Sequence, residues 1–221
     1  MEAHILIGII AVVALLITAF KFKSKQLAKR TAHIKNFKVP AKVLQTVKSR
    51  YPHLSDEQLK TVERGLREWF HVNLLAKGKP VSMPSQVVDV AWHELILFTK
   101  FYQDFCQKAF GRFLHHHPAE AMSSPKSAQQ GIKTAWKLAC AKERTSPLKP
   151  TRLPLLFAID ALLDIEDGFK YQLNCQGVDK EGYCATHIGC SASCGSSSAD
   201  SGGDSGGCSG GCSGGGCGGG S

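Results

Sequence analysis

Three groups of side chains in this sequence have the types and spacing needed to bind a metal ion or to transfer protons. Asp89 and His93 are four residues apart in a helical pattern, so they are neighbours on one helix face. Three consecutive histidines, His115 to His117, follow Gly111 by about one turn. A third group near the C-terminus contains Cys184, His187, Cys190 and Cys194.

The Asp89–His93 pair is open to two interpretations. A histidine beside an aspartate is commonly a structural hydrogen-bonded pair, and the same pair also orients metal ligands and acid–base catalysts. The sequence around it does not form a zinc-protease motif, because Leu97 stands where the second histidine is needed. His93 and His116 could share a metal ion only if the segment after Gly111 folds back; otherwise the histidines lie in a polar loop.

The C-terminal group offers four ligands within the eleven residues from Cys184 to Cys194, enough for a tetrahedral zinc site. Their spacing matches no recognised zinc-finger pattern. From Gly195 to Ser221, 13 of 27 residues are Gly, eight are Ser and three are Cys. Such a segment is expected to be disordered, as a linker or as a means of capturing soft metal. Cys106, by contrast, sits among aromatic residues and is expected to be an inert buried thiol.

These groups are positioned by a chain whose middle part is predicted to be helical. Pro40 begins a short helix to Arg50, and Ser55 with Gln58 forms a capping box that opens the next helix to about Ala76. Further helices are predicted at 84–110, 124–143 and 154–163. Residues 169–173 could form a short strand, but a single strand without a partner carries little weight. The fold class is therefore all-α: an N-terminal transmembrane helix, an irregular bundle of about five helices and a disordered Gly/Ser/Cys-rich tail.

The first residues predict a membrane anchor. Ile5–Phe20 is an apolar run that spans roughly 24 Å as a helix, and flanking residues extend it toward the ~30 Å of a bilayer core. No Lys or Arg precedes the run and no convincing cleavage site follows it, which favours an uncleaved anchor over a cleaved secretory signal. By the positive-inside rule we expect a single-pass inner-membrane protein with its N-terminus outside and its C-terminal domain in the cytoplasm.

The basic charge of the chain is concentrated beside this anchor. Residues 21–50 contain ten Lys or Arg and no acidic residue, and the rest of the chain, apart from Glu2, carries 17 basic and 17 acidic residues. A neutral folded region argues against nucleic-acid binding. The segment Lys21–Arg50 is instead expected to rest on anionic lipid.

The predicted boundaries follow from these features. They are a transmembrane anchor at 1–22, a basic juxtamembrane segment with the first helix at 23–50, a helical domain at 51–175, a Cys/His cluster at 176–194 and the tail at 195–221.

The stretch from Met83 to Tyr102, together with 105–106, 110–116 and Pro118, resembles bacterial glycine-rich, cysteine-tailed membrane proteins of uncharacterised function. Its Asp-x-x-Trp-His core is similar, more distantly, to plant glycine-rich domain proteins, although Leu95 replaces a second histidine of the plant pattern. The resemblance implies a small helical domain tied to a membrane. The positions that it singles out are Asp89, Trp92, His93, Tyr102, Cys106 and His116.

Two functions are compatible with this sequence. The first is a non-enzymatic interaction module with an unidentified protein partner and a tail that captures soft metal. The second is a metal-dependent or acid–base enzyme centred on Asp89 and His93 with His115 to His117. Zinc is the only cofactor that the residues suggest.

Overall fold

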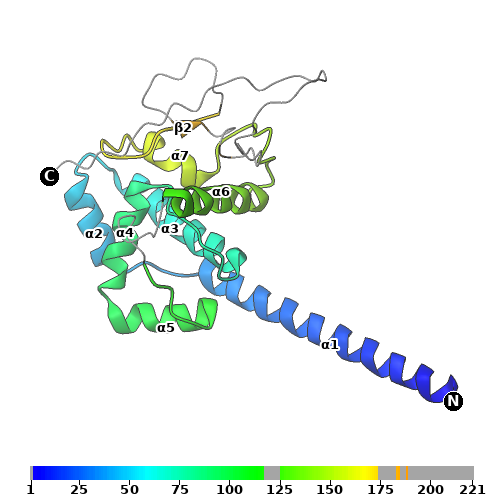
Figure 1. Ribbon diagram of the computed structural model, residues 1–221. Helices are drawn as coiled ribbons and strands as arrows, with labels where there is room; N and C mark the ends of the chain where they lie inside the picture. The colour runs from blue at the N-terminus through cyan, green and yellow to red at the C-terminus, as the bar shows by residue number, and fades with distance from the viewer. Residues whose placement is uncertain (1, 117–124, 174–182, 185–187, 189–221) are drawn as a thin grey trace, which may run out of the picture. The chain divides into compact units, whose positions relative to one another are not determined.

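The computed structural model describes residues 2–116, 125–173, 183–184 and 188 (Figure 1). Within these residues the fold is all-α, as the sequence predicts. The helices are α1 (Glu2–Lys35), α2 (Ala41–Arg50), α3 (Asp56–Ala76), α4 (Gln86–Ile96), α5 (Thr99–Phe110), α6 (Pro125–Lys142) and α7 (Leu155–Leu162). Two strands of two residues each, β1 (Tyr171–Gln172) and β2 (Tyr183–Cys184), pair in parallel.

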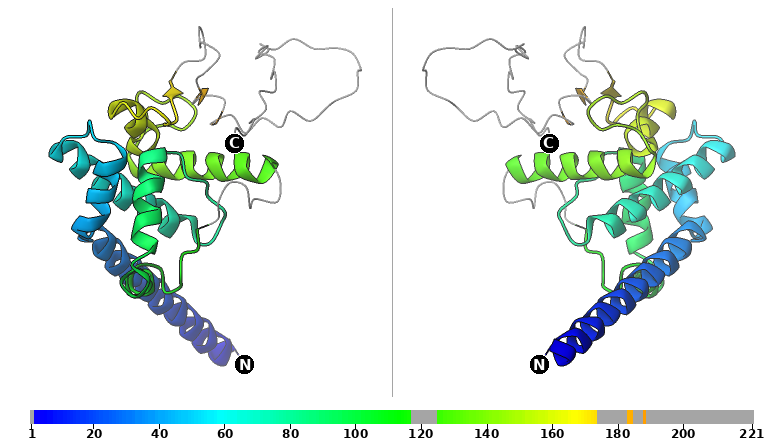
Figure 2. Two further views of the ribbon diagram at one scale, coloured as in Figure 1. Left: turned by 90° about the vertical axis from the view of Figure 1, so that its left-hand side faces the viewer. Right: turned by 90° about the vertical axis from the view of Figure 1, so that its right-hand side faces the viewer.

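Helix α1 contains the predicted anchor and continues without a break to Lys35 (Figure 2). Its apolar part is long enough to cross a membrane and is not buried against the rest of the chain. Toward the end of α1 the environment changes: Ile34 and the following Phe37 are buried, and the last turns of the helix pack on α3 and α5. The predicted anchor and much of the basic segment therefore form one continuous helix.

Helix α3 lies at the centre of the helical domain and contacts α1, α2, α4, α6 and α7. Its predicted capping box is confirmed, because the Ser55 hydroxyl accepts from the Gln58 amide and the Gln58 side chain accepts from the Ser55 amide. Gly65 allows α4 and α7 to approach closely. A Cβ at this position would lie 2.8 Å from side-chain atoms of both Val88 and Ile159.

The prediction of one long helix over 84–110 is wrong, because the chain breaks at Leu97 and Phe98 into α4 and α5. Phe98, with φ −79° and ψ 59°, is not helical. Apolar residues cover more than half of the circumference of the expected helix. The break lets the apolar residues of α4 and those of α5 pack on different neighbouring helices. Helix α4 packs on α2, α3 and α7, whereas α5 packs on α1. No Gly or Pro marks this break in the sequence.

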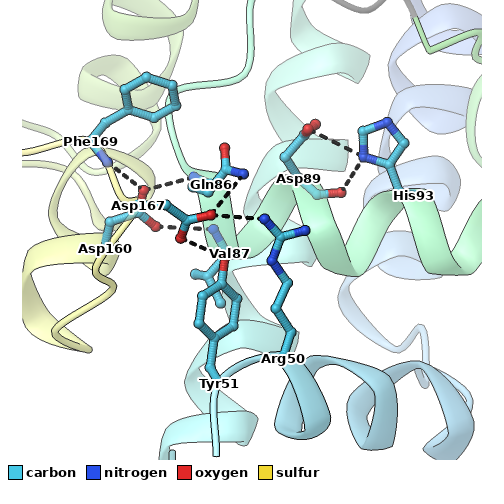
Figure 3. Close-up of polar contacts among 9 residues, drawn as sticks. All are labelled: Arg50, Tyr51, Gln86, Val87, Asp89, His93, Asp160, Asp167 and Phe169. Atoms are coloured by element: carbon cyan, nitrogen blue, oxygen red, sulfur yellow. Dashed lines mark hydrogen bonds and ion pairs between the residues drawn. The ribbon is translucent and has the colours of Figure 1, made fainter. Parts of the chain in front are cut away.

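A buried carboxylate fixes the start of α4. Asp160 of α7 is 2% exposed and accepts a hydrogen bond from the Ser85 hydroxyl at 2.7 Å. It accepts another from the Gln86 amide at 2.7 Å (Figure 3). It also accepts from the amides of Val87 at 3.3 Å and Phe169 at 2.9 Å. Amides at a helix N-terminus lack partners within the helix and favour a negative charge. Asp160 therefore joins α7, the start of α4 and the chain after α7.

Replacing Asp160 with Ala is expected to reduce the free energy of unfolding by about 3–5 kcal/mol, since buried donors would lose their charged acceptor. Asp167→Ala is the matched control. Its partners are the half-exposed Arg50 and the Tyr51 hydroxyl, so we expect a smaller loss of about 1–2 kcal/mol. Chemical unfolding of the full chain in detergent measures both, and equal losses would contradict this account of Asp160.

Candidate metal centre

Asp89 and His93 lie one turn apart on α4 (Figure 3). The Nδ1 atom of His93 is 3.2 Å from Oδ2 of Asp89 and 3.0 Å from the carbonyl oxygen of the same residue. Half of the His93 side chain is exposed, whereas Asp89 is three-quarters buried. The pair thus combines a sheltered carboxylate with an imidazole that solvent can reach.

The segment after α5 brings His116 to this pair. Helix α5 ends at Gly111, whose φ of 72° lies in the left-handed region that glycine adopts without strain. The chain then returns to α4, where Nε2 of His116 lies 3.1 Å from Oδ1 of Asp89. The His116 ring centre is 4.0 Å from that of His93 and 4.6 Å from that of Trp92. The segment after Gly111 thus folds back on α4, which the sequence permits but does not require.

Asp89, His93 and His116 each offer one ligand atom, and these three atoms all lie within 4.8 Å of one another. Each oxygen of the Asp89 carboxylate contacts one imidazole, Oδ1 that of His116 and Oδ2 that of His93, so the two rings lie beside the same carboxylate. Two imidazole nitrogens and a carboxylate oxygen are donors that zinc accepts. The arrangement can therefore hold a divalent ion or pass a proton between the rings.

A family model described as UCP032817-like matches residues 29–193. The chain belongs to the UCP032817-like family. This family is uncharacterised, so membership assigns no reaction. No curated protein and no solved structure matches the chain. Asp89, His93 and His116 all lie within the part of the chain that the UCP032817-like model covers.

Other residues predicted as ligands are not placed in this centre. His115 is exposed, and its ring lies against Phe113 with ring centres 4.8 Å apart. His117 lies outside the described residues. Of Cys184 the structure describes only the backbone, in β2, and the other members of that predicted cluster, His187, Cys190 and Cys194, lie outside the described residues. The zinc cluster near the C-terminus stays a prediction.

Trp92 and Tyr102 are singled out only by the family resemblance. In this UCP032817-like chain they form a buried hydrogen-bonded pair next to the candidate metal centre. Both are buried, and the Trp92 indole donates to the Tyr102 hydroxyl at 3.0 Å. The Tyr102 hydroxyl in turn donates to the carbonyl of Leu114 at 2.7 Å. In an unbroken helix Trp92 and Tyr102 would be about 15 Å apart along the axis. Sequence reasoning missed this link because it missed the break at Leu97 and Phe98.

The two buried thiols within the described residues are not suited to nucleophilic chemistry. Burial raises the pKa of Cys106 above its ordinary value and raises the pKa of Cys140 to about 11. A thiol is reactive as its thiolate, so both are protonated and inert at neutral pH. This agrees with the interpretation from the sequence.

We expect Cys140 to react with iodoacetamide at pH 8 about a hundredfold more slowly in the folded chain than in urea, because a raised pKa lowers the thiolate fraction. Cys106 should also react more slowly in the folded chain, for the same reason. Mass spectrometry of tryptic peptides after timed alkylation measures both rates. Reaction of either residue at its unfolded rate in the native protein would contradict the burial account.

Proposed function

We propose that this protein is a membrane-anchored helical domain that binds one divalent metal ion, with zinc as the best match, through Asp89, His93 and His116. The observation that carries the proposal is the set of three ligand atoms within 4.8 Å, supplied by two segments separated by a whole helix. This grouping is what distinguishes the pair on α4 from an ordinary structural Asp–His contact.

The proposed site has the features of a zinc centre with an open position. Three protein ligands leave the fourth tetrahedral position to water or to an incoming group. His93 is half exposed, which gives that position a route to solvent. Zinc binding requires both imidazoles in the neutral form, so affinity should fall as the pH is lowered. A three-ligand centre of this kind supports the metal-dependent enzyme hypothesis more directly than the tail-capture hypothesis.

The C-terminal cysteines remain a second proposed metal-binding region. Cys184, His187, Cys190 and Cys194 combine thiolate and imidazole ligands, which suit zinc or softer ions. Any measurement on the full chain must therefore separate this region from the helical centre. A background variant in which all seven cysteines from Cys175 to Cys217 are replaced by serine makes that separation.

In this serine-tailed background we expect the full chain to retain about one bound zinc ion and His116→Ala to lower zinc affinity by more than about a hundredfold, because a direct ligand is lost. Competition with a chromophoric chelator, followed by elemental analysis, measures affinity and stoichiometry. His115→Ala is the matched control, since this neighbouring exposed ring packs on Phe113 and is not one of the three grouped ligands. Equal zinc binding by the two variants would contradict the site.

We also propose that the helical domain lies on the cytoplasmic side of the inner membrane. The ten basic residues that follow the apolar run support this orientation through the positive-inside rule. Lys21 to Lys29 are exposed on α1, where they can contact anionic lipid. A cytoplasmic location would keep the C-terminal thiols reduced and free to bind metal.

A reporter fused after Ser221 tests this orientation. We expect green fluorescent protein at that position to fluoresce and alkaline phosphatase to be inactive, because only the former folds in the cytoplasm. Replacing Lys21, Lys23 and Lys25 with Gln should weaken the preference for a cytoplasmic C-terminus and increase phosphatase activity. Full phosphatase activity in the parent chain, or a mature N-terminus after Phe20, is the contrary result.

A further inference from the structure

The hydroxyl of Tyr102 helps to anchor the segment that carries His116, beside the Cys106 side chain, which also bonds to Leu114. Between Gly111 and His116 the chain is not helical. Tyr102 is completely buried, and its hydroxyl donates to the Leu114 carbonyl at 2.7 Å, two residues before His116. The Phe113 ring adds an edge-to-face contact to the Tyr102 ring, with centres 5.2 Å apart.

We propose that Tyr102 is a positioning residue of the metal centre, whose hydroxyl fixes the Leu114 carbonyl and thereby holds the His116 imidazole against Asp89. This inference rests on the metal-binding function proposed above. It assigns Tyr102 an effect on metal affinity although Tyr102 is not itself a ligand.

Two of the hydrogen bonds at the Tyr102 hydroxyl, those to Trp92 and to Leu114, have a fixed direction. The Trp92 indole can only donate, so the Tyr102 oxygen must accept from it. The Leu114 carbonyl can only accept, so the single hydroxyl proton must point to it. Burial raises the pKa of Tyr102 above its ordinary value, which keeps that proton in place at all physiological pH values. With its proton on the Leu114 carbonyl, the hydroxyl helps to hold the backbone of Leu114 in position.

The same chain of contacts connects directly to the ligands. Trp92 precedes His93 on α4, and its ring packs on the His116 ring. Helix α4, helix α5 and the returning segment thus meet at Tyr102, and each of the two segments that supply a ligand touches it. Loss of the hydroxyl leaves the Trp92 N–H and the Leu114 carbonyl without their partner in a buried place.

The decisive variant is Tyr102→Phe, which keeps the buried ring and removes only the hydroxyl. In the full serine-tailed chain we expect zinc affinity to fall about ten- to a hundredfold, the range seen when residues that orient metal ligands are replaced. Tyr51→Phe is the matched control. It also removes a hydroxyl that donates to a partner, Asp167 at 2.8 Å, but none of its contacts involves the 111–116 segment. We expect it to lower the melting temperature and to leave zinc affinity unchanged.

A double-variant cycle separates positioning from general destabilisation. If Tyr102 acts through His116, Tyr102→Phe should lower zinc affinity in the parent chain and add little in a His116→Ala chain. 4-Aminophenylalanine at position 102 restores an N–H donor toward Leu114 and should recover most of the affinity. Equal loss of affinity in Tyr102→Phe and Tyr51→Phe, or additive losses in the cycle, would overturn the inference.

A second readout does not depend on zinc. In the metal-free protein, the nuclear Overhauser effect between the Trp92 and His116 rings reports whether His116 is held against α4. We expect this effect to be present in the parent chain and in Tyr51→Phe and to be lost in Tyr102→Phe. Its persistence in Tyr102→Phe would refute the positioning role even if the chain binds zinc, and its loss would support the role even if zinc binding failed.

Discussion

The arrangement of this domain depends on a buried hydrogen-bonded chain from Trp92 through Tyr102 to the Leu114 carbonyl. It joins two helices that the chain could have formed as one, and it fixes the segment that returns after Gly111. A broken helix exposes backbone groups, so the break must be compensated by contacts elsewhere. Here the compensation comes from burying aromatic and aliphatic side chains on two different partners, with α4 on α2, α3 and α7 and α5 on α1.

The sequence predicts the local elements well and the long-range contacts poorly. The capping box at Ser55 and the proline starts at Pro40 and Pro154 are local signals, and the helices that they predict are present. The pairing of Asp89 with His93 is likewise set by helical spacing. The meeting of His116 with Asp89 depends on a break that no Gly or Pro marks. The hydrogen bonds accepted by Asp160 join residues about 75 positions apart, and no periodicity in the sequence predicts them.

The family match and the fold point to the same functional unit. The UCP032817-like region starts at residue 29, within the last turns of α1, where that helix becomes buried against α3 and α5. The apolar segment that is long enough to cross a membrane and the domain are therefore joined by a continuous helix. The proposed metal centre, which spans α4 and the segment after α5, lies wholly within this unit.

The most direct test of the account is the coordination sphere of bound zinc, measured by X-ray absorption fine structure on the full chain with its seven C-terminal cysteines replaced by serine. The account predicts a shell of nitrogen and oxygen atoms at about 2.0–2.1 Å with the multiple scattering of two imidazole rings. One ring should disappear in His116→Ala. Zinc that does not bind stoichiometrically, or a shell of oxygen alone, would contradict the claim that Asp89, His93 and His116 form a metal centre.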